Sequence, residues 1–282
     1  AVLDRPARAR SGGLAAPDAS RPGKELSVRR LLTVVLVFVA AHTVPVWAAG
    51  RAAAPAARVY LPLVMRRLTS PGQPPVRYET LPVFSAPTDR PAEEHPDLNL
   101  ALRGYAPTDA ARSLVDYGGA TDDHAPRLTG LFSPPRTPQI RGVYRVYAWD
   151  WSGNAPGAPI ASPPVTLIAL QATRGEALHL PPSGYDIGSG YQALVLYAAP
   201  HRLTLKYTRE DNVVTGYTLH IEGLDVHPAL LATYRAADAA GRGSLPALRA
   251  GQAVGVAADA EIGVAIRDAG TFMDPRSRKD WW

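Results

Sequence analysis

Short apolar runs recur about ten residues apart along the second half of this chain, with turn-forming residues between them. In residues 143–149 apolar and polar side chains alternate with the two-residue period of a strand, and residues 165–170 form an apolar run after two prolines. The 28 prolines and 24 glycines, against only 4 phenylalanines, favour short strands joined by turns over long helices. We therefore expect a mainly β fold, sandwich-like or barrel-like, with further strands at 193–197, 202–207 and 217–222.

One segment with a helical pattern interrupts the strands. Pro228 suits the first position of a helix, where its missing N–H costs nothing. Leu230, Leu231 and Tyr234 then share one face, and Gly241 suits the C-terminal end. The pattern predicts one short helix, about residues 228–241, inserted into the β scaffold.

The N-terminal residues 1–48 have the pattern of a secretory signal with a long n-region. Basic residues precede an apolar run at 31–41, and the small-residue exit Val46-Trp47-Ala48 follows it. The apolar run is short of the ~20 residues that a membrane-spanning helix needs. We expect cleavage after Ala48 and a secreted protein, extracellular or in the cell envelope, that meets the membrane only through its signal peptide.

The rest of the chain divides by composition into three parts. Residues 49–94 are rich in Ala and Pro and indicate a linker, with one apolar patch at 59–65 that suits a short strand. Residues 95–142 are irregular and rich in turns, apart from a strand-like alternation at 98–102, and residues 143–282 form the main β domain. The chain has no cysteine, so its stability must come from packing.

The charge of the chain says little about its partners. The formal net charge is +5, but the signal segment carries seven Lys or Arg against three Asp or Glu, and the remainder is nearly neutral. We therefore expect no nucleic-acid partner. The acidic loop Asp122-Asp123-His124 is interpreted as a solvated turn, because adjacent side chains project in different directions and no second ligand cluster lies at metal-binding spacing.

Several segments between residues 178 and 275 follow one another in an order known from one family. They are residues 183–187, similar to an H-x-G-x-D-I element; Ala198-Ala199-Pro200, at a small-residue hairpin; 217–224, like a Tyr-x-His-Leu strand; 248–255, matching a V-x-x-G-Q-x-V-x-x-G turn; and 261–275, parallel to H-L-H-F-E-I-R-x-x-G-x-x-x-D-P. Together they resemble the lysostaphin/LytM-type peptidoglycan endopeptidases, and the resemblance implies a duplicated β hybrid motif in a bacterial cell-envelope protein. Independently of the resemblance, Gly251 suits a positive φ in its turn, and Gly255 suits a close backbone approach.

The chain departs from this family where zinc would bind. The resemblance implies zinc ligands at a His and an Asp of the first element and at the second His of the H-x-H pair. Pro182 stands at the first His position, Glu261 and Gly263 stand at the pair, and only Asp186 has a counterpart. Catalytic zinc typically needs three protein ligands, so we expect a pseudoenzyme without a cofactor.

Displaced ligands are the alternative that keeps zinc. The candidate metal ligands are His179, Asp186 and His220, and the candidate catalytic residues are His220, Glu222 and Glu261. His220 and Glu222 fall on one face of a strand, where hydrogen bonding at a sheet edge is the simpler interpretation.

Aromatic side chains suggest a different kind of site. Tyr185, Tyr191, Trp149 and Trp151 could line a groove for a sugar or an extended peptide, although rings on one strand face also suit packing between sheets. We expect the terminal Trp281 and Trp282 to pack on the β domain, with Arg276 or Arg278 paired to nearby acids.

These observations predict a secreted, non-catalytic, lysostaphin-like β domain that binds or scaffolds cell-wall peptide or glycan. The alternatives are an active zinc metalloendopeptidase with displaced ligands and an unrelated secreted β-sandwich that binds carbohydrate or acts as an adhesin. The sequence leaves the oligomeric state open.

Overall fold

The computed structural model describes residues 76–282, and two antiparallel sheets with a few short helices make up this part of the chain. The signal segment 1–48 and the apolar patch 59–65 lie outside the described residues. Among the residues described, no helix is long and apolar enough to cross a membrane. The expectation of a mainly β protein is confirmed, and its sheets are open rather than closed on themselves.

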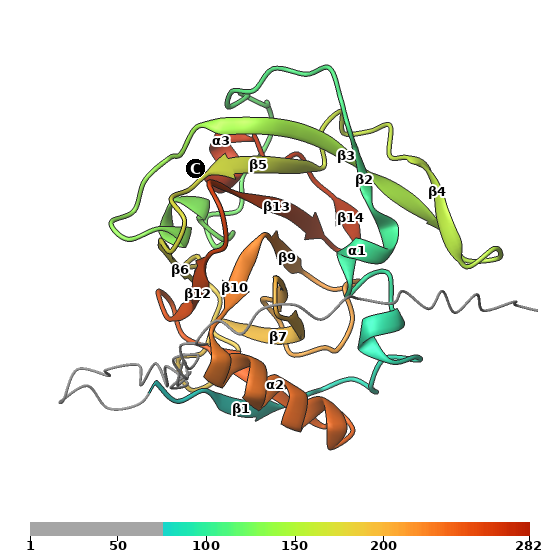
Figure 1. The fold of residues 1–282 in the computed structure, drawn as a ribbon, viewed down its shortest axis with the longest axis vertical. Coiled ribbons are helices and arrows are strands. Elements are labelled where there is room, and N and C mark those ends of the chain that lie inside the picture. The colour runs from blue at the N-terminus through green and yellow to red at the C-terminus, as the bar shows by residue number, and fades with distance from the viewer. Residues whose placement is uncertain (1–75) are drawn as a thin grey trace, which may run out of the picture. The chain divides into compact units, whose positions relative to one another are not determined.

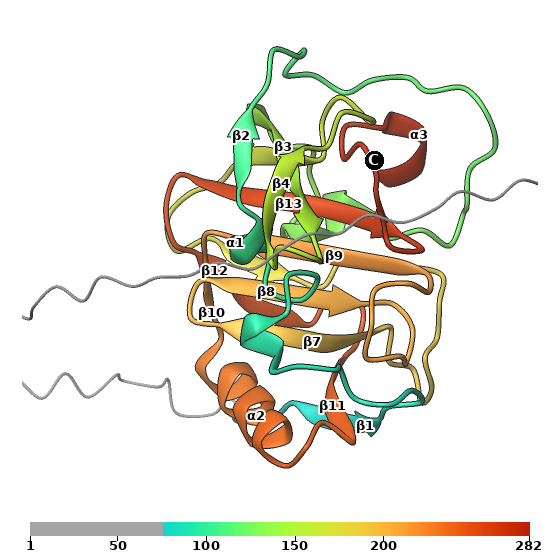
Figure 2. The same ribbon diagram turned by 90° about the vertical axis from the view of Figure 1, so that its right-hand side faces the viewer.

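The main sheet runs across the whole described region, and Figure 2 shows its strands stacked from β2 at the top to β1 at the bottom. Two short strands pair outside this path: β14 (Thr271–Phe272) with β13, and β4 (Ala155–Pro159) with β3. In spatial order the path is β1 (Glu79–Pro82), β11 (Ser244–Leu248), β7 (Ala193–Ala199), β8 (Arg202–Lys206), β9 (Tyr217–Glu222), β13 (Glu261–Asp268), β5 (Leu167–Gln171), β3 (Ile140–Asp150) and β2 (Tyr105–Pro107).

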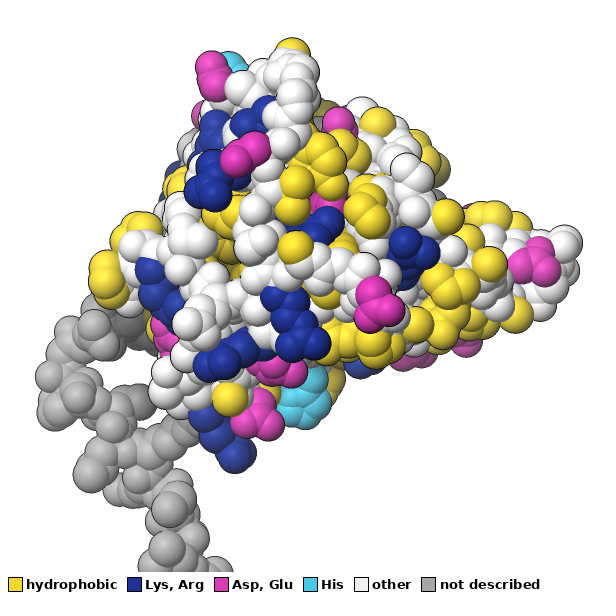
Figure 3. Space-filling view, turned by 90° about the horizontal axis from the view of Figure 1, so that it is seen from above, with side chains coloured by type: hydrophobic (Ala, Val, Ile, Leu, Met, Phe, Trp, Pro, Cys, Tyr) yellow, Lys and Arg dark blue, Asp and Glu magenta, His cyan; other side chains and the backbone are white. Residues whose placement is uncertain are grey.

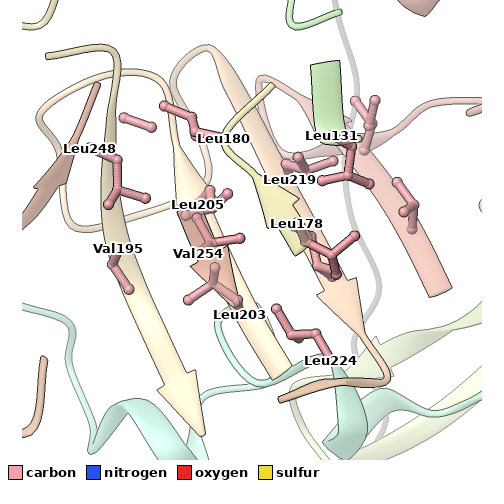
Figure 4. Close-up of a cluster of buried hydrophobic side chains, with 14 of the residues drawn as sticks. Leu131, Leu178, Leu180, Val195, Leu203, Leu205, Leu219, Leu224, Leu248 and Val254 are labelled. Atoms are coloured by element: carbon pink, nitrogen blue, oxygen red, sulfur yellow. The ribbon is translucent and has the colours of Figure 1, made fainter. Parts of the chain in front are cut away.

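A second, smaller sheet holds β10 (Leu224–Val226), β12 (Ala253–Ala257) and β6 (Ala177–His179), and it lies beside the main sheet in Figure 1. Buried leucine and valine side chains from both sheets meet between them. Figure 4 shows Leu178 and Val254 of the small sheet beside Leu203, Leu205 and Leu219 of the main sheet. Removal of these side chains from water is the main source of stability for a chain without disulfides.

The helix predicted near 228–241 is present as α2 (Pro228–Ala239). Pro228 occupies the first helical turn as expected, and the His227 side chain accepts a hydrogen bond from the Ala229 N–H at the N-cap. Past the helix end, Gly241 has φ of +89°, a conformation that glycine adopts without a Cβ clash. The helix packs against β11 and β7. The other helical segments are short: η1 (Ala92–Glu94), α1 (Leu100–Arg103), η2 (Leu128–Leu131) and α3 (Arg278–Trp281).

The strand-like alternation at residues 98–102 is misleading, because this segment turns into α1. In a strand Leu98 and Leu100 would face the same side. Here Leu98 enters the main core, whereas Leu100 enters a second cluster with Val146 and Phe272. The chain turns at Leu98 and α1 begins at Leu100, so the two side chains reach different clusters and packing overrides the local pattern.

The Gly-Gln turn has the backbone that the sequence predicts. Gly251 has φ of +65°, and a Cβ at Gly255 would meet the Asp225 carbonyl oxygen at 2.3 Å. Both the positive φ and the close backbone approach are therefore confirmed.

Gly251→Ala should cost about 1 kcal/mol of folding free energy, because the left-handed backbone disfavours a Cβ even where space is free. Gly243→Ala is the matched control: a Cβ there also meets nothing within 4 Å, and the φ of Gly243 is not positive. It should leave stability within about 0.5 kcal/mol. Urea unfolding of both variants makes the comparison, and equal losses would contradict it.

Candidate functional site

Polar side chains cover one face of the main sheet, where β8, β9 and β13 lie side by side. His220 and Glu222 share this face. On the neighbouring strand β8, Thr204 lies opposite His220 and Arg202 lies opposite Glu222. Because β9 lies between β8 and β13, the two residues are not at a sheet edge, which corrects the expectation from sequence. Their expected hydrogen bonds are present.

His220 is fully buried and held as a neutral imidazole. The Thr204 hydroxyl donates its proton to the Leu98 carbonyl at 2.6 Å, so it can only accept from His220 Nδ1, at 3.0 Å. Nε2 has no hydrogen-bond partner within residues 76–282, and the ring stacks on Phe272. Burial, aided by the positive charge of Arg267, lowers the pKa of His220 to about 3. Burial therefore disfavours the cationic imidazole near neutral pH.

Glu222 lies opposite Gly263 of the neighbouring strand β13. Its carboxylate accepts from Arg202 Nε at 3.2 Å, and burial raises its pKa. A Cβ added at Gly263 would meet the Glu222 Cβ at 3.3 Å. Glu261 is exposed at the start of β13, opposite Gln171 of β5.

The other metal candidates have separate surroundings. His179 lies on β6 of the small sheet, opposite Ala253. Asp186 Oδ1 accepts from the N–H groups of Gly188 at 2.7 Å and Gly190 at 3.2 Å, which closes a local turn. Within residues 76–282 no group of three or more His, Cys, Asp or Glu side chains could hold a metal ion. The residues at the implied ligand positions, Pro182, Glu261 and Gly263, do not fit zinc, because only Glu261 among them could supply a ligand atom.

The four aromatic candidates take part in different sets of contacts. Trp151, 52% exposed, contacts the His95 ring, and Trp149 is half-buried on β3. Tyr191 lies under the guanidinium of Arg249, 4.0 Å from its ring centroid. Tyr185 is 39% exposed, and its ring contacts the Tyr217 ring.

A groove runs along α3, between the C-terminal end of the chain and the turn at residues 117–122. Two adjoining hollows of about 390 and 360 Å³ form it, and they share Met273, Lys279, Asp280 and Trp281. Each of these two volumes is in the range of small-molecule binding sites. We refer to it as the α3 groove; its walls include Tyr117, Asp122, Tyr217, Asp268, Lys279 and Trp281.

The wall formed by the C-terminal residues is well anchored. The Trp281 side chain is 2% exposed, and its indole N–H donates to the Asp274 carbonyl at 2.8 Å. Arg276 pairs with Asp274 at 2.7 Å, and Arg278 pairs with Asp116 at 2.8 Å. The predicted docking of the terminal tryptophans and the pairing of the arginines are therefore confirmed.

A row of aromatic rings runs from the groove wall, at Tyr217 and Trp281, to residues beside the carboxylate of Asp122. His124, Tyr185, Tyr217 and Trp281 form a row, with successive ring centroids 5.7, 6.1 and 5.7 Å apart. Asp122 accepts from the hydroxyls of Tyr185 at 2.6 Å and Tyr217 at 3.1 Å. The Tyr185 hydrogen bond holds the pKa of Asp122 below its usual value and, reciprocally, helps to raise that of Tyr185 to about 12.

Sequence reasoning interpreted Asp122 only as part of a solvated turn. Its tyrosine partners are 63 and 95 residues away along the chain, so no local spacing could have indicated them. Asp268 is the second residue that sequence reasoning missed. Its carboxylate accepts no hydrogen bond from the described residues, although it faces the groove beside Tyr217. A half-exposed carboxylate of this kind is available to a ligand that donates hydrogen bonds.

The groove combines flat rings with carboxylate acceptors, and Lys279 is engaged internally by Ala120 and Asp280. On the face that Figure 3 shows, basic and acidic side chains are interspersed, and no large patch carries charge of a single sign.

No family model, curated protein or solved structure matches this chain.

Proposed function

We propose that this protein is a secreted carbohydrate-binding module that holds a neutral, hydroxyl-rich glycan in the α3 groove. The observation that carries the proposal is the unpartnered carboxylate of Asp268 in the groove wall, beside the partly exposed rings of Tyr217 and Tyr185, which both donate to Asp122. Sugars present C–H faces that pack on flat rings, and their hydroxyls donate to carboxylate oxygens. An acidic groove disfavours an anionic ligand.

The scaffold proposed for this groove is a degenerate lysostaphin-like hybrid motif of the cell envelope. What supports it is the placement of the motif-like segments: residues 217–222 form the central strand β9, residues 261–268 form the neighbouring strand β13, and the Gly-Gln turn joins β11 to β12. With this scaffold the partner would be cell-wall glycan or its attached peptide. The signal segment in the sequence supports export.

Retention on insoluble polysaccharides tests the proposal. Purified peptidoglycan, chitin and cellulose are each incubated with the protein at low and moderate salt, and soluble oligosaccharides of the retaining polymer are used as competitors. We expect retention on at least one polymer that survives moderate salt and is displaced by its own oligosaccharide. Absence of retention on all three polymers would overturn the proposal.

Asp268→Asn should weaken binding of the retained oligosaccharide about tenfold, because a charged acceptor is replaced by a neutral amide. Isothermal titration calorimetry measures the affinity. Asp109→Asn, at an exposed position outside the groove, is the matched control and should bind as the parent does. Equal affinity of parent and Asp268→Asn would remove Asp268 from the site.

Hydrolysis by a zinc site with displaced ligands stays a separate prediction. Metal analysis of the purified protein together with a peptidoglycan digestion assay tests it. Stoichiometric zinc and released muropeptides would favour the enzyme over the binding module.

A further inference from the structure

A second hollow lies away from the α3 groove, where the start of β1 meets two turns. Its volume is about 300 Å³, and its lining residues are Arg77, Glu79, Tyr191, Arg249 and Gln252. Arg77 precedes β1, Tyr191 ends the glycine-rich turn before β7, and Arg249 and Gln252 belong to the turn after β11. We refer to it as the Arg249 pocket.

The Arg249 guanidinium is held in a fixed position. It lies 4.0 Å above the Tyr191 ring, and its Nη1 donates to the Ser189 carbonyl at 2.7 Å. Tyr191 is itself buried, with its hydroxyl bonded to the Glu79 carboxylate. A Cβ at Gly190 would meet Arg249 Nη1 at 2.8 Å, so the glycine leaves the room that the guanidinium takes. Stacking and a carbonyl anchor fix the side chain before any ligand arrives.

The pocket has donors without protein acceptors. Among residues 76–282, neither Arg77 nor Arg249 forms an ion pair with a carboxylate, and Nε and Nη2 of Arg249 donate no hydrogen bond to a protein acceptor beside the one that Nη1 donates to Ser189. One oxygen of Glu79 is engaged by Tyr191, and its other oxygen is free to accept. Two guanidiniums beside one carboxylate leave an excess positive charge in a concave site. A planar anion fits the fork of a guanidinium by two parallel hydrogen bonds.

We propose that the Arg249 pocket binds the C-terminal carboxylate of a peptide. The carboxylate pairs with Arg249 and Arg77, and the free oxygen of Glu79 accepts the adjacent peptide N–H. The small volume suits a chain end of one or two residues rather than a long segment. This site shares no lining residue with the α3 groove, so the test of one site does not decide the other.

A dipeptide and its amide test the proposal on the whole protein. N-acetyl-alanyl-alanine is titrated by calorimetry against its C-terminal amide, and inorganic phosphate is titrated separately. We expect the free acid to bind about tenfold or more tightly than the amide, because only the acid carries the charge that the guanidiniums meet. Equal affinity for acid and amide, or phosphate binding as tight as that of the acid, would overturn the assignment.

Two variants localise the binding. Arg249→Gln and Arg77→Gln should each weaken the acid at least about tenfold, because each removes a charged donor. Arg77 is exposed, so its replacement leaves the fold intact. Arg174→Gln, at another exposed arginine, is the matched control and should bind as the parent does. Thermal unfolding confirms that each variant is folded, and parent-like affinity in both pocket variants would refute the site.

Discussion

Arg242→Leu should destabilise the protein by about 3–5 kcal/mol, because it leaves a buried carboxylate without its partner. Arg242 bonds Asp211 through two nitrogens at 2.7 Å each, and the Asp211 side chain is fully buried. The Arg242 guanidinium also donates hydrogen bonds to the Asp238 carboxylate, the Tyr234 hydroxyl and the Leu196 carbonyl. One side chain therefore ties α2 to β7 and to the loop after β8. Urea unfolding followed by far-UV circular dichroism measures the loss.

An exposed ion pair provides the control for this prediction. Arg278 pairs with Asp116 at 2.8 Å, but both side chains are more than half exposed. Arg278→Leu should change stability by no more than about 1 kcal/mol, because water solvates the freed carboxylate. Losses of the same size in both variants would show that burial of Asp211 does not determine the effect.

Acidification should unfold the parent more readily than a variant without His220. The folded-state pKa of His220 is about 3, against 6.5 for the free side chain, so the unfolded chain binds the extra proton between these values. The stability from neutral His220 is complete above pH 6.5 and falls as the pH drops toward 3. The loss approaches about 1.4 kcal/mol for each pH unit in the middle of this window.

The comparison requires His220→Gln, and His95→Gln as a second variant. Burial also lowers the pKa of His95, so this residue contributes to the same window. Burial acts to raise the pKa of Asp97, but Arg267 and Arg103 hold this pKa below its usual value. The stability that the Asp97 carboxylate contributes is therefore lost only at more acidic pH. Urea midpoints between pH 7 and pH 4.5 give the slopes. A parent slope that persists in His220→Gln would refute the assignment to His220.

Features that depend on near neighbours could be predicted from the sequence. The strand at 217–222 and the helix start at Pro228 lie where side-chain period and backbone restraint place them. Gly251 and Gly255 were identified because only glycine suits their backbone. The segment 98–102 failed the same reasoning, since its two leucines serve different clusters.

The candidate sites were far less predictable. The sequence indicates Tyr185 and Tyr191 as groove residues, and Tyr191 lines the Arg249 pocket, but it indicates Asp122 only as part of a turn and gives no signal for Asp268. Arg249 carries no local signal either, because the Tyr191 beneath it is far away along the chain. The alternation along the strand predicts that His220 and Glu222 share one face, but it does not predict how deeply these side chains are buried.

The sequence by itself determined the strands, the inserted helix and the glycine turns of this protein, because those depend on forces between residues a few positions apart. Only the tertiary structure decided that Asp122 meets two tyrosines, that Asp211 is buried with Arg242, and that Arg249 lies in a pocket. Such contacts arise when distant strands pack together, and the free energy of that packing is set by the whole chain.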